Sequence, residues 1–576
     1  AEALLLLIAR YGFHRLVFRG LDILWMAPIS LAVLGTLAAV PLASLARSRV
    51  GRRWPGLPFF VLALLILLNV SPDIPKVHAL ARLILLAGIA AAAGRQAAKH
   101  AGVVLRFVQM TLVPLLAMVV LLALGVRGGR RIQERRALAA LPRAAPAAPN
   151  VLFLMLDTVR ALDLSLYGYS RLTSPALDRL AARAVVFERA YAPSSWTLNS
   201  HAAVFTGHRP FETGVGWTTP LDRRFPTLAE ALRARGYTTA GFSANPYYVT
   251  REAGLARGFI HFDDRRIAPK TVLLASSLAA TISTPIRKAL HWYRTPEHKS
   301  AARLRGELST WLTTQPTTRP FFVFANFFDA HAPYLPPAPF DTAFTGRRVP
   351  WAARKLDLTF PRAVTVQEAA VERDAYDQVV AAQDYQIGVL FEELEARGLL
   401  QNTLIIVTAD HGEEFGEWGF LSHGNSLNPA ALWVPLLLVL PGDRGAGTRI
   451  REPVSLLDLS ATILTLADPT RQSELPGSSL VGEGVPRPAA QPTPLVAELE
   501  YAPDTPTWFQ HSEGPLRAVT LPDWHYIREN DRREILLDIR SDPAGRRATL
   551  TQQPAQTALR IARAVLDSLI PAAPIH

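Results

Sequence analysis

The sequence predicts an α/β catalytic domain, in which a mostly parallel sheet is flanked by helices, with a small C-terminal α+β subdomain and a preceding all-α transmembrane domain. Three observations predict this organisation. Four long apolar runs occupy the first 126 residues. Five short apolar runs then alternate with helical patterns, which is typical of parallel sheets. Near the C-terminus, two short strand-like runs joined by a polar turn indicate a hairpin.

Charge divides the chain in a similar way. The first 149 of the 576 residues hold 18 Lys+Arg and 4 Asp+Glu, whereas the other 427 hold 43 and 44. The basic first quarter is apolar between its arginines, which favours anionic lipid headgroups as its partner. The rest shows no basic patch with interleaved aromatic residues, so nucleic acid is not expected as a partner. The absence of cysteine excludes disulfides and thiolate metal sites, and it fits a protein that works outside the cytoplasm.

The N-terminal quarter is predicted to be membrane-embedded. Residues 1–20 are too short and too basic to span a bilayer alone, and we interpret them as an interfacial helix or the tail of a missing span. About four spans follow, because four runs are long and almost uncharged: 23–46, 54–71, 77–94 and 107–126. Residues 1–128 are therefore assigned to the transmembrane domain. Residues 129–149 form a linker that ends in the Pro/Ala-rich stretch LPRAAPAAP.

The orientation of the spans is not decided by charge. The basic loops 47–53 and 95–99 are expected to face the cytoplasm, so the chain would leave the fourth span outward. Residues 127–143 carry six Arg and one Glu directly after that span, which favours the opposite orientation.

The catalytic domain is expected over residues 150–470, and the C-terminal subdomain over 471–576. Strands of the catalytic domain are predicted at 151–156, 240–243, 321–327, 404–408 and 436–439. Helices are predicted at 227–235 and 374–397, and 266–300 and 340–371 are interpreted as insertions near the mouth of the active site. The C-terminal hairpin is expected at 524–527 and 535–539, and the last helix at 555–569.

Side chains with metal-binding chemistry follow two of these strands. Asp157 comes directly after the first strand, and Asp410 and His411 follow the fourth. Parallel strands place their ligands at the carboxyl edge of a sheet, so these groups can converge on one cation. One imidazole among oxygen ligands suits Mn²⁺, Zn²⁺ or Mg²⁺. The alternative is that Asp157 and Asp410 only cap helices.

A hydroxyl side chain completes this predicted site. Thr197 precedes the small apolar run 202–205, which predicts a buried helix, and a loop-to-helix junction directs backbone N–H groups at a bound anion. A cation shared by Thr197 with the three strand-end side chains would lower the pKa of the threonine hydroxyl and make it a nucleophile.

Six stretches resemble the sulfatase family of the alkaline phosphatase superfamily, in its membrane-anchored branch with a Thr nucleophile. They extend over about 400 residues in the family's order: DTVRA (157–161), SWTLNSH (195–201), FFDAHAPY (327–334), NTLIIVTADHGEEFGEWG (402–419), SHG (422–424) and LLDIRSDP (536–543). The resemblance implies an alkaline-phosphatase-like fold and a hydrolase or transferase that cleaves sulfate- or phosphate-type esters through a covalent Thr adduct.

The resemblance also assigns roles to single residues. Thr197 stands where relatives carry a Cys or Ser nucleophile, and its unmodified hydroxyl favours phosphoryl chemistry. His331 and His423 would contact the non-bridging oxygens of the ester or protonate the leaving group. Three residues are assigned to substrate binding, with an ion pair as the alternative for the arginine: His201, Asn199 and Arg160.

Other features of the resemblance bear on the metal and the neighbouring groups. Calcium is disfavoured, because calcium-dependent relatives usually carry Asn at the position of His411. Glu413 and Glu414 are expected to orient neighbouring groups. Asn199 departs from the family's usual Pro, and this change is expected to affect the substrate pocket.

Relatives with membrane spans act on external polymers or lipids. The resemblance therefore implies a catalytic domain that faces the periplasm or exterior of the inner membrane, with an ester-bearing lipid, glycan or small molecule as substrate. One alternative is a phosphoglycerol- or phosphoethanolamine-type transferase that modifies envelope lipid or glycan. An inactive membrane scaffold is the alternative of another class, and the retention of Asp157, Thr197, Asp410 and His411 argues against it.

Overall fold

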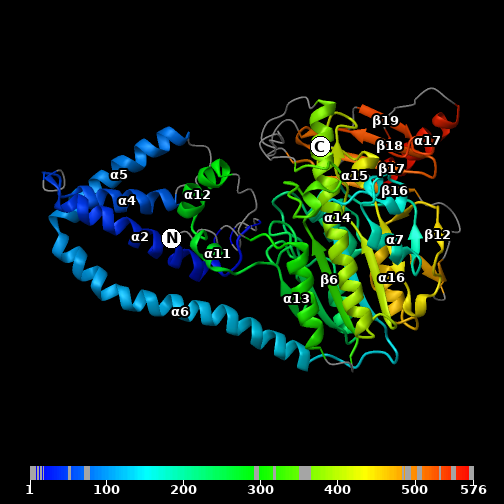
Figure 1. Ribbon diagram of the computed structural model, residues 1–576, viewed down its shortest axis with the longest axis horizontal. Coiled ribbons are helices and arrows are strands. Elements are labelled where there is room, and N and C mark those ends of the chain that lie inside the picture. Colours follow the sequence, from blue (N-terminus) through cyan, green and yellow to red (C-terminus); the bar gives the residue numbers. More distant parts are fainter. Residues whose placement is uncertain are drawn as a thin grey trace, which may run out of the picture. The chain divides into compact units, whose positions relative to one another are not determined.

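The chain folds into two compact units in the computed structural model (Figure 1). The first consists of Ala1–Arg136 and Arg266–Glu297, and the second of Ala137–Arg265 and His298–His576. The structure describes residues 8, 12, 16, 18–49, 53–70, 78–290, 297–315, 319–348, 365–482, 485–486, 494–502, 509–530, 533–545 and 553–569. Most of the predicted interfacial segment 1–20 and part of the predicted insertion 340–371 lie outside these ranges.

The first unit contains the predicted spans as helices. These are α2 (Ile23–Arg47), α4 (Leu57–Val70), α5 (Ala79–Lys99) and α6 (Ala101–Ala139). Within the described residues, three stretches are long and apolar enough to cross a membrane: Ile23–Ser44, Leu80–Lys99 and Ala101–Ala139. Helix α4 has only 14 residues, fewer than the roughly 20 that a span needs. The three long helices suggest membrane anchoring.

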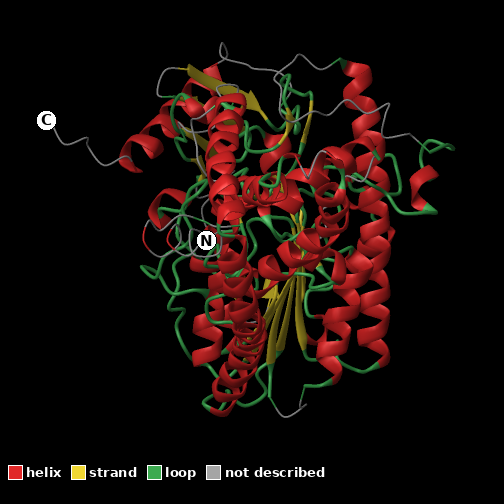
Figure 2. Ribbon diagram, turned by 90° about the vertical axis from the view of Figure 1, so that its left-hand side faces the viewer, coloured by secondary structure: helices red, strands yellow, loops and turns green. Residues whose placement is uncertain are grey.

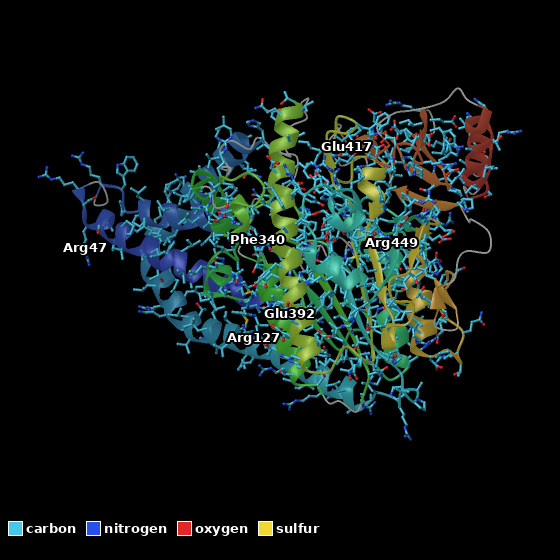
Figure 3. All side chains as sticks on the ribbon, turned by 45° about the vertical axis from the view of Figure 1, so that its right-hand side comes forward. Arg47, Arg127, Phe340, Glu392, Glu417 and Arg449 are labelled. Carbon is cyan, nitrogen blue, oxygen red and sulfur yellow. The ribbon has the colours of Figure 1, made fainter. Side chains whose placement is uncertain are left out.

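The last helix of the first unit does not end at the expected domain boundary, residue 128. Helix α6 continues to Ala139, so much of the predicted linker is helical. Figure 3 labels Arg47 at the C-terminal end of α2 and Arg127 within α6, two of the arginines that make this unit basic. The expected division into domains at 128, 149 and 470 stays a prediction.

A close helix pair lies within the first unit, where α4 packs against α5. A Cβ atom on Gly94 of α5 would lie 2.8 Å from the backbone nitrogen of Phe60 on α4. Only glycine allows this approach, and small residues at helix contacts are typical of membrane helix pairs.

The insertion predicted at 266–300 is helical, and it belongs to the first unit. Its helices α11 (Pro269–Leu273) and α12 (Ser277–Ala289) contact α2, and α12 also contacts α4. The segment thus packs on the apolar helices, and its interpretation as an insertion near the active-site mouth stays a prediction. Both ends of the insertion are held together in the second unit, where buried Lys299 Nζ lies 2.7 Å from Asp263 Oδ1.

The second unit is built on an eight-stranded sheet of order β12-β2-β11-β7-β1-β6-β4-β5. Strands β5, β4, β6, β1 and β7 are mutually parallel. Their bounds, with those of β2, β11 and β12, are His261–Asp263, Thr238–Ser243, Phe321–Phe327, Asn150–Leu156, Thr403–Thr408, Val185–Phe187, Leu436–Val439 and Arg449–Ile450. All five predicted strands are present, and the mostly parallel sheet is confirmed.

Strand β11 departs from the parallel pattern, because it runs antiparallel to both β7 and β2. A parallel neighbour needs a long crossover, usually a helix, whereas an antiparallel neighbour does not. Between β7 and β11 the single helix is the four-residue α15 (Pro429–Leu432), too short for a crossover helix, which agrees with the reversal.

Helices pack in two groups around this sheet, and Figure 2 shows the strands between helices. One group consists of α7 (Pro175–Ala181), α13 (Ala301–Thr313) and α14 (Val366–Ala396). The other consists of α8 (Thr197–Thr206), α10 (Leu228–Ala234) and α16 (Asp458–Ala467). Helix α14 begins eight residues before its predicted start, because Thr365 and Glu368 form a capping box there.

The C-terminal part forms a four-stranded antiparallel sheet covered by one helix. The strands are β16 (Leu495–Leu499), β17 (Leu516–Thr520), β18 (Trp524–Glu529) and β19 (Arg533–Asp538), and the helix is α17 (Gln553–Leu569). Tyr526 and Leu536 of the sheet are buried in one core with Ala562 and Leu566 of the helix. The predicted hairpin and last helix are confirmed.

Candidate active site

The candidate site forms at the carboxyl edge of the three central strands. Strand β1 lies between β6 and β7, with Met155 opposite Thr408. Asp157 and Asp410 therefore leave the sheet at the same level, each two residues after the last paired position. The backbone N–H of Asp157 donates to Phe327 O of β6 at 2.9 Å, which fixes the turn after β1.

Three side chains at this edge have the arrangement of a metal site. Ligand atoms of Asp157, Asp410 and His411 lie within 4.8 Å of one another, and all three residues are fully buried. Asp157 Oδ1 and Asp410 Oδ2 are buried oxygens that accept no hydrogen bond among the described residues. Two such oxygens fit a divalent cation, because buried carboxylates otherwise need a partner for each oxygen.

Burial opposes ionisation of both carboxylates. Burial, followed by the neighbouring Asp410, raises the pKa of Asp157 well above its usual value. Burial also raises the pKa of Asp410 to about 7. A bound cation would reverse these shifts, because a nearby positive charge favours the ionised form.

The other carboxylate oxygens are anchored by the protein. Asp157 Oδ2 accepts hydrogen bonds from Asn245 Nδ2 at 2.9 Å and Asn326 Nδ2 at 3.4 Å. Asp410 Oδ1 accepts the backbone N–H groups of Thr158 at 3.2 Å and His411 at 2.9 Å. The two asparagines were not predicted. They lie in β6 and directly after β4, so the strand-end criterion that selected Asp157 also applies to them.

Thr158 holds an unusual backbone conformation that serves Asp410. Its φ is 63°, a value that side chains other than glycine rarely adopt. This conformation directs its N–H at Asp410, and its hydroxyl donates to Ala330 O at 2.8 Å. Tyr376 OH donates to the carbonyl of Thr158 at 2.8 Å, so the strained turn is held from two sides.

The ring of His411 is oriented by its own backbone. Its Nδ1–H donates to Gly412 O at 3.0 Å, which leaves Nε2 as the atom with a lone pair. Nε2 lies 3.1 Å from Thr197 Oγ1, and burial lowers the pKa of the ring. A neutral imidazole with Nε2 directed at the cluster is the form that ligates a metal.

Thr197 is the first residue of helix α8, and only 2% of it is exposed. Its position at the N-terminus of a ten-residue helix places the positive end of the helix dipole beside the hydroxyl. One turn later, Ser200 Oγ donates to Asp410 O at 2.6 Å. The helix that carries the hydroxyl is thus fastened to the loop that carries two of the three ligands.

His331 and His423 lie beside this cluster. The His423 ring is 4.5 Å from that of His411 and 4.9 Å from that of His331. His423 Nδ1 donates to Glu413 Oε1 at 2.9 Å, and His331 Nδ1 donates to Ala332 O at 2.7 Å. Burial lowers the pKa of His331 to about 3 and that of His423 well below its usual value, and it raises the pKa of Glu413 to about 7.

These contacts leave Nε2 of each ring for a ligand. Each Nδ1 is fixed by a neighbouring oxygen, so the orientation of both rings is set before substrate binds. The expected orienting role of Glu413 agrees with its contact to His423. Glu414 accepts hydrogen bonds from Ser426 Oγ and Asn428 Nδ2, so it holds the loop that follows His423.

The aromatic neighbour of Thr197 was not predicted. Trp196 stacks on Trp217 with ring centroids 3.7 Å apart, and its ring lies 5.8 Å from that of His423. A Cβ on Gly424, which has a φ of 71°, would lie 2.6 Å from the Trp196 ring. The glycine after His423 is therefore needed both for its backbone conformation and for the approach of the tryptophan.

Asn199 and His201 are buried in α8 close to Thr197. Asn199 Nδ2 donates to Val215 O at 3.1 Å. His201 Nδ1 donates to Thr197 O at 2.8 Å, and its ring packs edge-on against Phe205 and Phe324. Burial lowers the pKa of His201 to about 3. Both side chains hold the first turn of the helix, and their contact with substrate stays a prediction.

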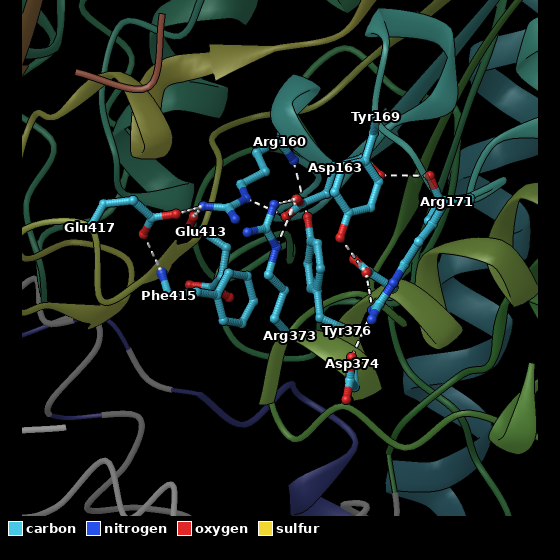
Figure 4. Close-up of polar contacts among 12 residues, drawn as sticks. Arg160, Asp163, Tyr169, Arg171, Arg373, Asp374, Tyr376, Glu413, Phe415 and Glu417 are labelled. Atoms are coloured by element: carbon cyan, nitrogen blue, oxygen red, sulfur yellow. Dashed lines mark hydrogen bonds and ion pairs between the residues drawn. The ribbon is translucent and has the colours of Figure 1, made fainter. Parts of the chain in front are cut away.

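Arg160 is surrounded by acids in a buried network, which Figure 4 shows. It forms ion pairs with Asp163 and with Glu417 Oε1, the latter at 2.6 Å, and donates to Glu413 O at 2.9 Å. Arg373 pairs with the other oxygen of Asp163. Of the two alternatives for Arg160, the ion pair is present in the structure, and a contact with substrate stays a prediction.

Comparisons with known proteins agree with this fold and site. The model of the Sulfatase family matches residues 149–469. A Sulfatase of Formosa agariphila is 24% identical over 432 residues, covering 69% of this chain and 82% of that protein. An Arylsulfatase of Clostridium perfringens is 23% identical over 390 residues, covering 58% and 77%. The crystal structure of a phosphonate monoester hydrolase of Agrobacterium radiobacter is similar with a TM-score of 0.56 and 23% identity, covering 73% of this chain and 95% of that one.

The fold and the buried edge of acids and histidines define an ester hydrolase built on a mostly parallel α/β sheet. The family match covers more than half of the chain. The chain therefore belongs to the sulfatase family, within the alkaline phosphatase superfamily, and it carries apolar helices before the family domain.

Proposed function

We propose that this protein is a membrane-anchored, metal-dependent hydrolase that cleaves phosphate- or sulfate-type esters with Thr197 as nucleophile. The observation that carries the proposal is the buried Thr197 hydroxyl, 3.1 Å from His411 Nε2 and next to two carboxylates with unpartnered oxygens. One divalent ion, Mn²⁺, Zn²⁺ or Mg²⁺, would be held by Asp157, Thr197, Asp410 and His411. The ion would supply positive charge that lowers the pKa of the hydroxyl and neutralises the ester oxygens.

Each step of the proposed reaction is assigned to a side chain of the site. Thr197 Oγ1 loses its proton to water and attacks the phosphorus or sulfur atom, while the bond to the leaving oxygen breaks. The negative charge of the bound ester would raise the pKa of both rings, so that His423, held by Glu413, and His331 take up protons from solvent at Nε2 when substrate binds. His423 then donates its proton to the leaving oxygen, and His331 donates a hydrogen bond to a non-bridging oxygen. A water molecule then attacks the Thr197 adduct, the bond to Thr197 Oγ1 breaks, and the proton of the water passes through the neutral His423 to Oγ1, which restores the hydroxyl.

Phosphate-type esters are proposed ahead of sulfate esters. By resemblance, sulfate-cleaving relatives usually use a formylglycine, whereas this chain has no cysteine and carries Thr197 at that position. The named relatives in the comparisons include both sulfatases and a phosphonate monoester hydrolase, so the family alone supports both kinds of ester.

Turnover by the full chain in detergent tests the proposal. Aryl phosphate, aryl phosphodiester and aryl sulfate substrates are compared under Mn²⁺, Zn²⁺ and Mg²⁺. Thr197→Ala is expected to lower the rate by about 10³-fold or more while folding and metal content persist, and Thr197→Ser is expected to keep measurable activity. Mass spectrometry should find a trapped adduct on the peptide that contains Thr197. A Thr197→Ala variant with the wild-type rate would exclude the covalent mechanism.

Transfer to an acceptor is a second outcome of the same experiment. Adding glycerol or ethanolamine as acceptor alcohol would yield a new phosphodiester if the Thr197 adduct is resolved by an alcohol. Release of inorganic phosphate alone supports hydrolysis. This distinguishes a phosphoglycerol- or phosphoethanolamine-type transferase from the proposed hydrolase.

We further propose that the catalytic unit faces the periplasm or exterior of the inner membrane. The basic loops 47–53 and 95–99 support this orientation. Because the chain lacks cysteine, a single Leu172→Cys variant, at a position that is 71% exposed, can be labelled in spheroplasts with a membrane-impermeant maleimide. Labelling without lysis supports the outward orientation, and labelling only after lysis contradicts it.

A further inference from the structure

The insertion Arg266–Glu297 is fixed to the apolar helices by buried polar contacts. Ser30 Oγ of α2 donates to Leu273 O at 2.6 Å and lies 2.9 Å from Ser276 Oγ. The backbone N–H of Leu278 donates to Asn69 Oδ1 of α4 at 3.0 Å. Ser30 and Ser276 are fully buried, so α2 and α4 satisfy the polar groups at the turn between α11 and α12.

Apolar packing supports the same attachment. Ala275 belongs to a small buried cluster with Ile23 and Ala27 of α2. Leu278 and Ala279 are buried at the beginning of α12. The insertion is therefore a structural part of the unit that contains the candidate spans.

The later part of α12 exposes large apolar side chains in a row. Ile282 is 45% exposed, Ile286 52%, and Leu290, which follows the last helical residue Ala289, 50%. The three positions are four residues apart, so they continue the face of Leu278 beyond its buried beginning. Exposed apolar residues on soluble proteins are usually scattered singly, whereas a contiguous row marks a contact with a partner or a membrane.

We propose that α12 is a second membrane anchor, which lies in the bilayer interface with Ile282, Ile286 and Leu290 in contact with lipid. With 13 residues, α12 is too short to span the hydrocarbon core, so the geometry is that of an in-plane helix. Arg287 lies between these apolar positions in sequence, and basic side chains at an interfacial helix can reach anionic headgroups.

Lipid is favoured as the occupant because α12 contacts α2, which is a candidate span of the same unit. On the candidate spans, exposed apolar side chains are also frequent, including Leu37, Val40, Ile84 and Leu121. A second copy of the chain on this face is the competing outcome of the test. The sequence after α12 continues with Trp292, Tyr293 and Arg294, residue types that are enriched at membrane interfaces.

The anchor is joined to a defined part of the catalytic unit. The insertion begins shortly after Asp263, the last residue of β5, which is parallel to β4, β6 and β1. Asp263 therefore lies at the carboxyl edge of the sheet, the edge that also carries Asp157 and Asp410. A second anchor at this edge would restrict the motion of the catalytic unit on its membrane tether.

A single-cysteine variant tests the proposal directly, because the full chain has no cysteine of its own. Ile286→Cys is labelled with a fluorescent probe and reconstituted in phosphatidylcholine vesicles with or without brominated acyl chains. The matched control is Ile561→Cys, an isoleucine of similar exposure, 46%, on helix α17 of the other unit. Thermal unfolding of both labelled variants confirms that they are folded.

Brominated lipid is expected to quench the probe at position 286 by roughly two-fold and to leave that at position 561 almost unchanged, as for an interfacial helix. Ile282→Cys should behave like Ile286→Cys. Equal quenching at 286 and 561 would overturn the proposal. Efficient crosslinking of two Ile286→Cys chains by a short bismaleimide, without quenching, would show instead that a second copy covers this face. None of these readouts depends on catalysis, so failure of the proposed function leaves the test intact.

Discussion

Two clusters of buried charge lie next to each other after strands β1 and β7, and they differ in how their charges are satisfied. The ligand cluster consists of Asp157, Asp410 and His411, and it leaves two carboxylate oxygens without a hydrogen bond. The Arg160 network, formed by Arg160, Asp163, Arg373 and Glu417, joins each acid to an arginine (Figure 4). Buried acids that are a few residues apart in sequence therefore differ in whether an arginine neutralises them.

The difference in pairing separates a candidate binding site, the ligand cluster, from a structural cluster, the Arg160 network. Breaking a paired buried charge leaves its partner uncompensated, so the Arg160 network contributes to stability and positions the loops around it. Unpartnered carboxylates cost folding free energy, and they persist where they bind a ligand. Pairing therefore indicates which buried acids are free to bind a cation.

The largest expected effect is the loss of activity when the ligand cluster is changed. Asp410→Asn should lower turnover by about 10³-fold, because a metal contributes several kcal/mol of charge stabilisation to the transition state. The unfolding temperature without metal should be unchanged or higher, since one unpartnered buried charge is removed. Turnover and thermal unfolding of the purified variant measure both quantities. A variant that keeps its activity would remove the ligand cluster from the mechanism.

Changing the Arg160 network should affect stability most. Arg160→Met is expected to cost about 3–5 kcal/mol, because it leaves Glu417 with uncompensated charge in a buried position and Asp163 with Arg373 as its remaining arginine. Arg449→Met is the control, since the side chains of Arg449, labelled in Figure 3, and its partner Glu188 are 42% and 30% exposed. That pair should contribute about 1 kcal/mol or less. Equal losses in both variants, measured by chemical unfolding, would contradict the comparison.

Metal should stabilise the protein through the ligand cluster alone. After chelation, adding Mn²⁺ or Zn²⁺ at about 100 times its Kd should raise the free energy of unfolding by about 2.7 kcal/mol. This gain should disappear in Asp157→Asn and persist in Glu417→Gln, which lies in the Arg160 network. Thermal unfolding with and without metal measures it. A gain that survives in Asp157→Asn would place the metal elsewhere.

The smallest expected effect is a pH dependence at the margin of the Arg160 network. Asp377 accepts hydrogen bonds from Tyr169 and Arg171, yet burial and then the neighbouring Asp163 raise its pKa from 3.8 to about 7. Because the folded pKa is above the unfolded one, ionisation of Asp377 lowers stability as pH rises from about 4 to 7, and the full loss persists above 7.

Asp377→Asn should remove this loss. The stability of the variant relative to wild type should increase by about 2.5 kcal/mol between pH 5 and pH 8. Chemical unfolding at the two pH values measures the change. A relative stability that is independent of pH would mean that Asp377 ionises as easily in the folded chain as in the unfolded one.

Local patterns were sufficient to predict the strands and the buried acids that follow them. A run such as 151–156 is buried on both faces and ends at Asp157, so the positions of the strand and of the carboxylate follow from neighbouring residues alone. The role of Asp157 as a metal ligand stays a prediction. The C-terminal hairpin and helix α17 follow from local periodicity in the same way.

Features that depend on distant partners were not predicted. Ser30 and Ser276 are 246 residues apart in sequence, and no local pattern links them. The ion pair of Arg160 with Glu417 and the hydrogen bond from Tyr376 to Thr158 also arise from tertiary packing. The direction of β11 depends on the connection that precedes it, whereas its apolar composition fits either direction.

The clamp between Lys299 and Asp263 has a practical consequence for producing the catalytic unit in soluble form. A chain shortened to begin after α6 would still carry α11 and α12, and their buried faces would be exposed without α2 and α4. Since Lys299 Nζ lies 2.7 Å from Asp263 Oδ1, residues 266–297 can be exchanged for a short Gly/Ser loop that spans the clamp. The enzyme then becomes separable from its apolar helices by two edits at distant positions in the gene, neither of which touches a strand of the sheet.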